Sequence, residues 1–548
     1  MAESTSASQT SAKEPAPSYL DAGRGPSSWL LTTDHKRIAL MYLASVLVIF
    51  ALGGTLAGLV RLKMLWPGEA LIDPATWLRL LTLHGVVMGF AFVVPAIPAV
   101  LGNFLVPLMV GAKGVAYPRL NRASLYLYWA GALIALSSFA SGGLDTGWML
   151  APPRSTTAEG PVPAVALGVF VMGFSGALTG LNFLGTIHRM RAPGLSWHKL
   201  PMTLWALYAT SLLHLVATPA LGSAMLVLLA DRAFGLGQFD VAKGGSPLVY
   251  QQLFWFYAHN AVYLALLPGV GVVSEVIAVH ARRSFGYWPI VAATFGTAGL
   301  GLVAWGQHLV VAGQSPHSSA LFSVLGLLAI VPMFVLVLSW LATLWRGSIA
   351  LTVPMLYALG FVALFTIAGL AGLFLAMLAQ GAYLSSSYFE VAHLHYLVVG
   401  GTAMAFLAGL HHWWPKITGR TTSESLGRLG WGLLMLGINA TFFVQFVLGS
   451  RGMPRRHYAY EEGLRFLQGF STVGTWILGL GVLVVLGVFV QSLRSGSKAA
   501  ANPWGGASLE WRAPSPPLAA NFVEAPVVEH GPYDFGAALA ATPEAKAA

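Results

Sequence analysis

One short stretch decides the fold, Ala-His-Leu-His-Tyr at residues 392–396, which lies inside an apolar run over residues 391–414. A run of this length crosses the hydrocarbon core of a bilayer as a helix. Because two residues correspond to a rotation of about 200° along a helix, His393 and His395 leave opposite faces. This spacing argues against one shared four-ligand metal centre. It suits two flat cofactors that flank the helix, each bound axially by one imidazole.

Similar apolar runs recur along the whole chain. Of its 548 residues, 56% are hydrophobic and only 9% are charged, whereas a soluble domain carries about a quarter charged residues. A β-barrel would show shorter segments of alternating polarity. We therefore predict an all-α integral membrane protein with about 12 transmembrane helices, centred on residues 38–60, 81–110, 124–142, 164–187, 204–229, 253–279, 289–313, 321–344, 351–378, 391–414, 431–448 and 473–490.

The ends of the chain differ from this apolar region. Residues 1–27 are rich in Ala, Ser and Pro and are predicted to form a disordered tail, residues 28–495 one transmembrane domain, and residues 496–548 a second tail. The net charge is +10, and most Lys and Arg residues gather in alternate loops. This asymmetry places both tails in the cytoplasm. The basic charge therefore reflects membrane topology and does not indicate a nucleic-acid partner.

The chain contains no cysteine. This excludes a covalent c-type haem attachment, an iron–sulfur cluster, thiolate-bound copper and an internal disulfide. Electrons for any redox reaction must therefore come from another subunit or from a separate donor.

Further histidines lie in the predicted helices, where polar residues are costly and usually functional. His84, in the second run, could close one of the two flat cofactors from a second helix. In the sixth run, His259 and Tyr263 are four residues apart and share a face. If the sixth and seventh helices face the second cofactor, His259, His308 and Gln307 could hold a metal beside it.

Each of these histidines, taken singly, could equally be a hydrogen-bonded residue of the core. We expect that simpler role for His214, His411 and His412. The pair at residues 393 and 395 together with His84 is harder to explain in that way.

Six ordered stretches match one known family: TDHKRI at residues 33–38, GNFLVPL at 102–108, YPRLN at 117–121, VAHLHY at 391–396, GMPRR at 452–456 and NPW at 502–504. Over nearly its whole length the chain resembles subunit I of cytochrome c oxidase, the catalytic subunit of the haem-copper oxidase superfamily. The resemblance implies the helical bundle of that subunit in the inner (cytoplasmic) membrane. It also implies partner membrane subunits and an electron-donating subunit or a cytochrome c or cupredoxin-type donor.

The resemblance assigns cofactors to the histidines. It implies that His84 and His395 bind a low-spin haem and that His393 is the proximal ligand of a high-spin haem. Arg455 and Arg456 match the pair that holds the haem propionates, for which the guanidinium fork is well suited.

The same resemblance assigns a non-haem metal to His259 and His308. Tyr263 matches the tyrosine that the family links covalently to the first of the metal-binding histidines.

Several positions depart from the pattern of the proton-pumping members. The buried glutamate of their His-Pro-Glu-Val-Tyr motif is absent from residues 259–263, and Gly114 and Leu336 replace the aspartate and lysine of their two proton paths. Gln307 replaces a histidine, and serines at 385–386 replace a His-Asp pair near an outer Mg²⁺ site. A proton cannot cross an apolar span without polar stepping stones, so we do not expect pumping by the usual route.

Two acidic residues lie in the predicted spans. We expect Glu275 to reach the membrane interface at the inner end of its helix. Glu390 precedes His393 by three residues and shares its face, which favours a proton donor or an oxygen ligand to the metal. The alternative is an acid that is stabilised by the helix N-terminus. Two imidazoles with a carboxylate and the amide of Gln307 would favour iron over copper.

These departures resemble the nitric-oxide-reducing branches, so the sequence favours reduction of two NO molecules to N₂O and water, without proton pumping. Tyr263 favours the alternative, reduction of O₂ to water, because that tyrosine supplies an electron and a proton in oxidases. A haem-bearing relative without catalytic activity remains a third reading. A transporter would show inverted repeats and broken helices, and the sequence has neither.

Overall fold

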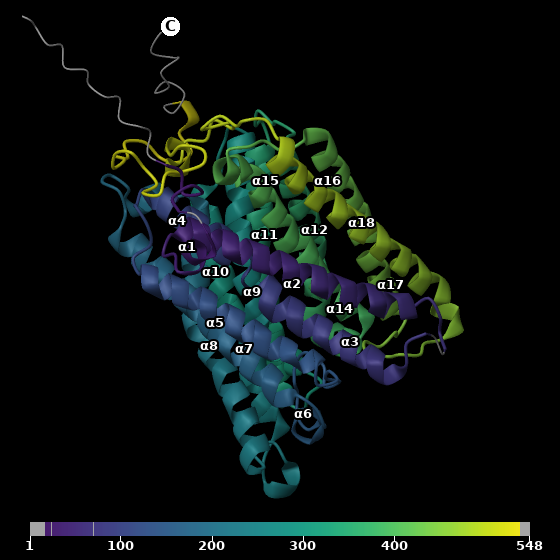
Figure 1. The fold of residues 1–548 in the computed structure, drawn as a ribbon. Coiled ribbons are helices and arrows are strands. Elements are labelled where there is room, and N and C mark those ends of the chain that lie inside the picture. The colour runs from purple at the N-terminus through teal and green to yellow at the C-terminus, as the bar shows by residue number, and fades with distance from the viewer. Residues whose placement is uncertain (1–16, 24, 69–70, 537–548) are drawn as a thin grey trace, which may run out of the picture.

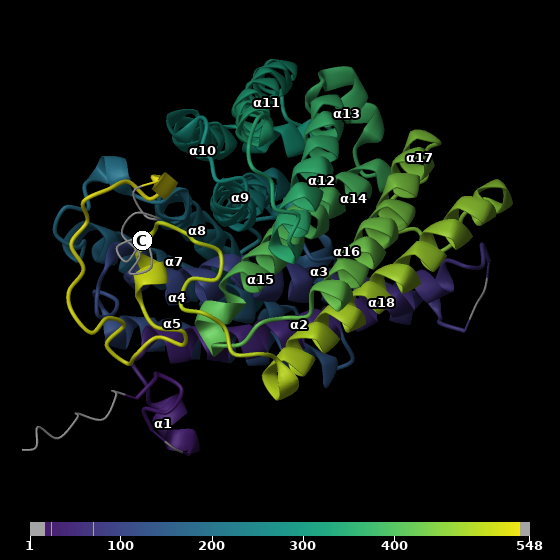
Figure 2. The same ribbon diagram turned by 90° about the horizontal axis from the view of Figure 1, so that it is seen from above.

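The computed structural model describes residues 17–23, 25–68 and 71–536, so most of the predicted N-terminal tail and the last residues of the C-terminal tail lie outside the described part. Within it, the regular elements are all helical. The long helices run roughly side by side as one bundle (Figures 1 and 2). They are α2 (His35–Lys63), α3 (Pro74–Val86), α4 (Asn103–Val110), α5 (Pro118–Leu136), α7 (Val162–Arg189), α8 (Met202–Phe234), α9 (Pro247–His280), α10 (Tyr287–Val303), α11 (Pro316–Leu344), α12 (Val353–Ala376), α14 (Tyr388–His395), α15 (Met404–Thr418), α16 (Glu424–Ile438), α17 (Val444–Ser450) and α18 (Arg465–Ser495).

The all-α membrane prediction is confirmed. Among the described residues, 11 helices are long and apolar enough to cross a membrane. The remaining predicted run, residues 124–142, falls largely in α5, which packs along α7. This helix of 19 residues is less apolar because its first turns contain Arg119, Asn121 and Arg122.

Several spans combine two helices joined by a widened, π-helical segment. One such segment, Val87–Val93, follows α3, and another, Tyr396–Ala403, joins α14 to α15. A third, Asn439–Phe443, joins α16 to α17. Such segments occur often at functional sites, because an extra residue per turn rotates the side chains that follow. The segments Val87–Val93 and Tyr396–Ala403 begin within three residues of a predicted haem ligand.

Burial separates the central helix from the outer ones. In the most apolar part of α9, 94% of the residues are buried, against 33% in α11 and 28% in the span ending with α18. α11 presents a stripe of exposed apolar side chains at helical spacing, as expected for a lipid-facing surface; they are Leu321, Val324, Leu328, Val331, Phe334, Leu338 and Leu341.

Both tails pack against the same end of the bundle, which we call the base (Figure 1). Tyr19 is fully buried, and its backbone N–H donates to Pro517 O at 3.0 Å. The segment 496–536 crosses the base (Figure 2), where Asn521 Nδ2 donates to Ala112 O at 2.7 Å. We call the opposite end, with the loops at residues 143–160 and 451–461, the rim.

Candidate functional site

His84 and His395 form the first histidine pair, which joins α3 to α14. Their rings are parallel to within 3°, and the ring centroids are 6.4 Å apart. Nitrogen–metal bonds measure about 2 Å, so this gap fits one metal ion between the two rings. The Nδ1 atom of His84 lies 2.9 Å from Gly53 O, and that of His395 lies 2.7 Å from Val391 O. Each backbone contact leaves Nε2 as the free ligand atom.

Two further side chains surround this pair, and the sequence did not indicate either. Phe442 stacks on His395 with centroids 4.4 Å apart. Arg61 is buried on α2, where it donates to Gln468 and Thr472 on α18, but its Nε has no hydrogen-bond partner. A buried guanidinium N–H without a partner suits a polar substituent of a cofactor. In the sequence, an arginine near the end of an apolar helix gives no signal of such a contact.

His259 and His308 form the second pair, between α9 and the short 3₁₀ segment Trp305–Leu309 that follows α10. The Nδ1 atom of His259 lies 3.0 Å from Nε2 of His308. Two nitrogen atoms at this distance can bind one metal ion through bonds of about 2 Å. Trp255 stacks on His308, with centroids 4.0 Å apart and planes 9° apart, which holds this ring in place.

Tyr263 lies one turn from His259 on the same face of α9. The two ring centroids are 5.2 Å apart, and His259 Nε2 is buried without a hydrogen-bond partner. The ring of Tyr263 packs so closely on Gly301 of α10 that a Cβ there would meet it at 2.5 Å. Nε2 of His259, the ring nitrogen that does not face His308, therefore remains free.

His393 faces away from the first pair, as the spacing predicts. Its ring lies against Gly372 of α12, where a Cβ would come within 3.2 Å of it, and its Nδ1 is buried without a partner. His259 and His308 both lie within electrostatic range of this ring. The second pair and His393 therefore belong to one region of the bundle.

Glu390 and Gln307 are not brought to the second pair. Glu390 Oε2 forms an ion pair with Arg455 at 3.2 Å and accepts from Ser386 N at 2.9 Å. The side-chain oxygen of Gln307 points to Gly326 of α11, 2.3 Å from the position of a Cβ there. In the described part of the chain, no three His, Cys, Asp or Glu side chains gather as a metal site.

The two predicted propionate ligands lie at the rim. Arg455 donates its backbone N–H to Ser386 O at 2.8 Å, and Arg456 donates to Asp145 O at 3.3 Å. Burial, together with the neighbouring Arg455, lowers the pKa of Arg456. An anionic partner would stabilise the buried charge of Arg456, which fits a carboxylate-bearing cofactor.

The comparisons with known proteins agree with this geometry. The family described as Cytochrome C and Quinol oxidase polypeptide I matches residues 37–483. The cytochrome c oxidase subunit 1 of Thermostichus vulcanus is 38% identical over 533 residues, which cover 96% of this chain and 97% of the relative. A protein of the same name from Synechocystis sp. is 40% identical and covers 92% of each chain.

The chain belongs to the subunit I family of the haem-copper oxidases. A solved haem-copper terminal oxidase dimer has the same fold, with a TM-score of 0.73 over 86% of each chain at 16% identity. The family implies haem and a copper or related metal centre. The names of the curated relatives fit the alternative function, cytochrome c oxidase, better than the NO reduction that the sequence favours.

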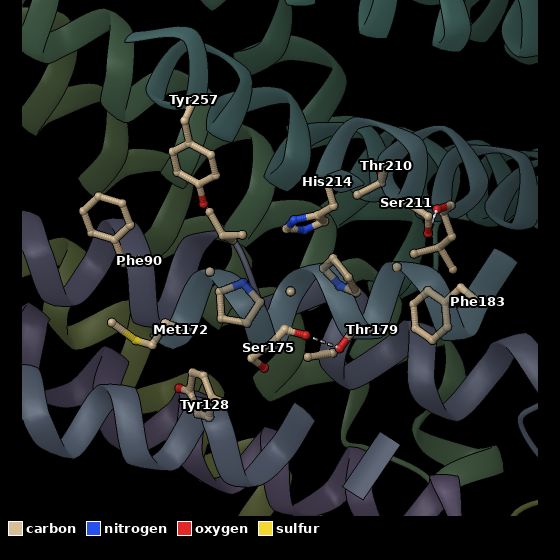
Figure 3. Close-up of a pocket in the computed structure, with 18 residues that line it drawn as sticks. Phe90, Tyr128, Met172, Ser175, Thr179, Phe183, Thr210, Ser211, His214 and Tyr257 are labelled. Atoms are coloured by element: carbon tan, nitrogen blue, oxygen red, sulfur yellow. Dashed lines mark hydrogen bonds between the residues drawn. The ribbon is translucent and has the colours of Figure 1, made fainter. Parts of the chain in front are cut away.

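A cavity of about 30 Å³ lies between α7, α8 and the second span, at residues 90–99 (Figure 3). Polar side chains line part of it, and Tyr257 points into it from α9. Its other polar lining residues are Tyr128, Ser175, Thr179, Thr210, Ser211 and His214. The sequence gives no sign of this feature, because single serines and threonines in apolar helices usually bond only to their own backbone. Only the packing of α5, α7, α8 and α9 brings these polar residues together.

Glu275 does not reach the interface, so this prediction is wrong. Its side chain is fully buried near the base, and Tyr533 of the C-terminal segment donates to Oε2 at 2.7 Å. Tyr533 belongs to the segment 496–536, so the C-terminal segment packs against Glu275 of α9.

Proposed function

We propose that this chain is the catalytic subunit of a cytochrome c oxidase-type enzyme that reduces O₂ to water. The observation that carries the proposal is the placement of Tyr263 beside His259, whose Nε2 is free, on the face that meets His308. NO reduction needs no such tyrosine. The names of the curated relatives support the same reading.

Five histidines would hold the cofactors through their free nitrogens. His84 and His395 would hold a low-spin haem, His393 would hold a high-spin haem, and His259 with His308 would hold the non-haem metal. When bound, these groups relay electrons and take up the oxygen molecule. The rigid backbone contacts of the first pair fix both rings during electron transfer.

Copper is the metal that we propose. The argument for iron depended on Gln307 and Glu390 as ligands, and both side chains point elsewhere in the structure. Two imidazoles without a carboxylate form a softer set, which suits copper. With only two side-chain ligands, the metal keeps open positions, as catalytic sites generally do.

Tyr263 is the residue that would complete the reduction of O₂. Cleavage of the O–O bond requires one more electron and proton than the metals readily supply. A phenol beside the metal can give both as a hydrogen atom. The buried site excludes water that would otherwise react with the oxidised tyrosine.

Protons for this reaction would come from the base through the hydroxyl-lined cavity. Tyr42 contacts both Ser124 and Ser175, at 3.2 and 3.1 Å, and Ser175 lines the cavity. Near the base, Asn121 is buried with both its side-chain oxygen and nitrogen unpartnered. Buried polar atoms of this kind are usually satisfied by water. Because Gly114 and Leu336 lack titratable groups, we propose this route for the chemical protons and no pumping by the usual paths.

The proposed enzyme lies in the inner membrane with the base in the cytoplasm, in accord with the basic loops. A cytochrome c, a cupredoxin-type donor or an electron-donating subunit would reduce the first pair's haem from the rim, and further membrane subunits would complete the complex.

The test uses the purified complex with an O₂ electrode, an NO electrode and metal analysis. We expect O₂ consumption and one copper per chain. Tyr263→Phe should abolish O₂ reduction while both haem spectra remain, and any NO reduction should persist. Full O₂ activity of Tyr263→Phe, or NO turnover without O₂ turnover in the unmodified enzyme, would overturn the proposal. Haem without either activity would indicate the non-catalytic relative.

A further inference from the structure

His214 lies in the middle of α8 and lines the cavity shown in Figure 3. Its side chain is buried, with 4% of its surface exposed. Nδ1 lies 3.3 Å from the hydroxyl of Thr218, one turn along the same helix. Among the described residues, Nε2 has no hydrogen-bond partner, so this nitrogen is available to a water molecule in the cavity.

Part of the cavity wall packs closely against the imidazole ring of His214. On α7, a Cβ at Gly176 would meet His214 Cε1 at 2.7 Å, so a larger residue there would displace the ring. A water molecule needs about 10–15 Å³ of cavity volume, so the cavity of about 30 Å³ can hold about two. The ring therefore borders a space with room for water, whereas a core histidine is enclosed by packed side chains.

The other polar groups of the cavity cannot easily carry a proton. Thr179, Thr210 and Ser211 donate their hydroxyl protons to carbonyl oxygens of their own helices, at 2.6–2.9 Å. They can therefore accept hydrogen bonds from water but are not free to donate. The lining contains no Asp, Glu, Lys or Arg, and its other titratable groups are Tyr128 and Tyr257.

Imidazole is the only one of these groups whose ordinary pKa lies near neutral pH. It can therefore bind a proton and release it again. A proton that moves along water molecules beside serine and threonine hydroxyls finds no comparable group to bind it, because those side chains do not ionise.

We propose that His214 is the proton-relay residue of this cavity. Nε2 takes a proton from a hydronium ion on the base side, which leaves a water molecule there, and then gives this proton to a water molecule on the side of α9 where Tyr257 points into the cavity. No electron moves in this step, and the imidazole returns to its neutral form. The inference rests on the proposed function, which requires proton delivery to the second pair.

The test compares two variants of His214 with a matched control in the purified complex. His214→Leu removes the proton-binding group, and His214→Gln keeps a polar side chain that cannot hold a proton. His411→Leu removes another buried imidazole, which packs on Tyr357 and Phe489 away from the cavity. Steady-state turnover, its pH profile and proton uptake from a pH-indicator dye are measured with the haem spectra.

We expect turnover and proton uptake to fall by about 100-fold in both His214 variants, the lower end for loss of a general acid–base group, with unchanged haem spectra. The pH profile of turnover in the unmodified enzyme should change in both variants. Imidazole added to His214→Gly should restore part of the rate. His411→Leu should keep its turnover.

Normal proton uptake in His214→Leu would overturn the inference. Full activity of His214→Gln would do the same, because it would show that a polar filler is sufficient. If the unmodified enzyme reduces NO but not O₂, the proposed function fails while the relay is still tested, since NO reduction also consumes protons and the same variants are then assayed with NO.

Discussion

The two histidine pairs of the bundle are held in different ways. In the first pair, both Nδ1 atoms contact backbone carbonyls, and the rings of His84 and His395 lie parallel. In the second pair, His259 and His308 face each other at 3.0 Å with their planes inclined by 60°. The orientation of His308 comes from packing on Trp255.

Under the proposed function, this difference separates an electron-transfer site from a reaction site. Backbone contacts on both rings fix the tautomer and orientation of the first pair, so both imidazoles would keep Nε2 for a haem iron. The second pair gives only two side-chain ligands and leaves coordination positions open for a substrate. The first pair is thus held rigidly, whereas the second pair would leave coordination positions of its metal unfilled by side chains.

The largest expected effect comes from breaking the first pair. His84→Ala should remove the low-spin haem absorbance but leave a haem that binds CO. Turnover should fall by more than about 100-fold, because even loss of a residue that merely orients a ligand costs 10- to 100-fold. Absorbance and CO-difference spectra measure both haems. Loss of CO binding instead would show that the two faces of α14 are assigned to the wrong cofactors.

The next largest effect is expected when the second pair is broken, and it should appear as a loss of the non-haem metal. His308→Ala should lower the affinity for the non-haem metal by about 100-fold while both haems remain, as measured by metal analysis and spectra. Trp255→Phe is the matched control, since it keeps an aromatic ring against the imidazole and should retain the metal. A variant without His308 that binds copper normally would contradict the assignment of this pair.

Glu390→Gln distinguishes an ion pair from a metal ligand. The Glu390–Arg455 pair is partly exposed, at 19% and 22% of the two side chains, so its loss should lower the stability by only about 1 kcal/mol. Both haems and the metal should remain, as followed by thermal melting of the haem absorbance and by metal analysis. Loss of the metal would return Glu390 to the ligand set of the second pair.

The smallest effect is expected at Gln307. Because its amide points to Gly326 and away from the second pair, Gln307→Leu should leave the metal content unchanged and alter stability by less than about 1 kcal/mol. Metal analysis and melting again provide the measurement. A metal-free Gln307→Leu protein would identify the amide as a third ligand.

The sequence predicts the helices and the ligand faces because both follow from periodicity within one helix. Apolar runs locate the spans, and a two-residue spacing places His393 and His395 on opposite sides. The directions of Gln307 and Glu390 depend on neighbouring helices, so sequence spacing could not give them. The burial of Glu275 depends on Tyr533, which lies 258 residues later in the chain.

The base of the bundle also joins the first helix to the far end of the described chain. Lys36 is fully buried, and its Nζ donates to Asn521 Oδ1 at 2.7 Å and to Ala519 O at 3.1 Å. The ribosome makes α2 long before it makes these partners. During synthesis, the ammonium group of Lys36 must therefore stay in contact with water or lipid headgroups. Closure of the base is consequently a late step of assembly, after all the membrane helices have been inserted.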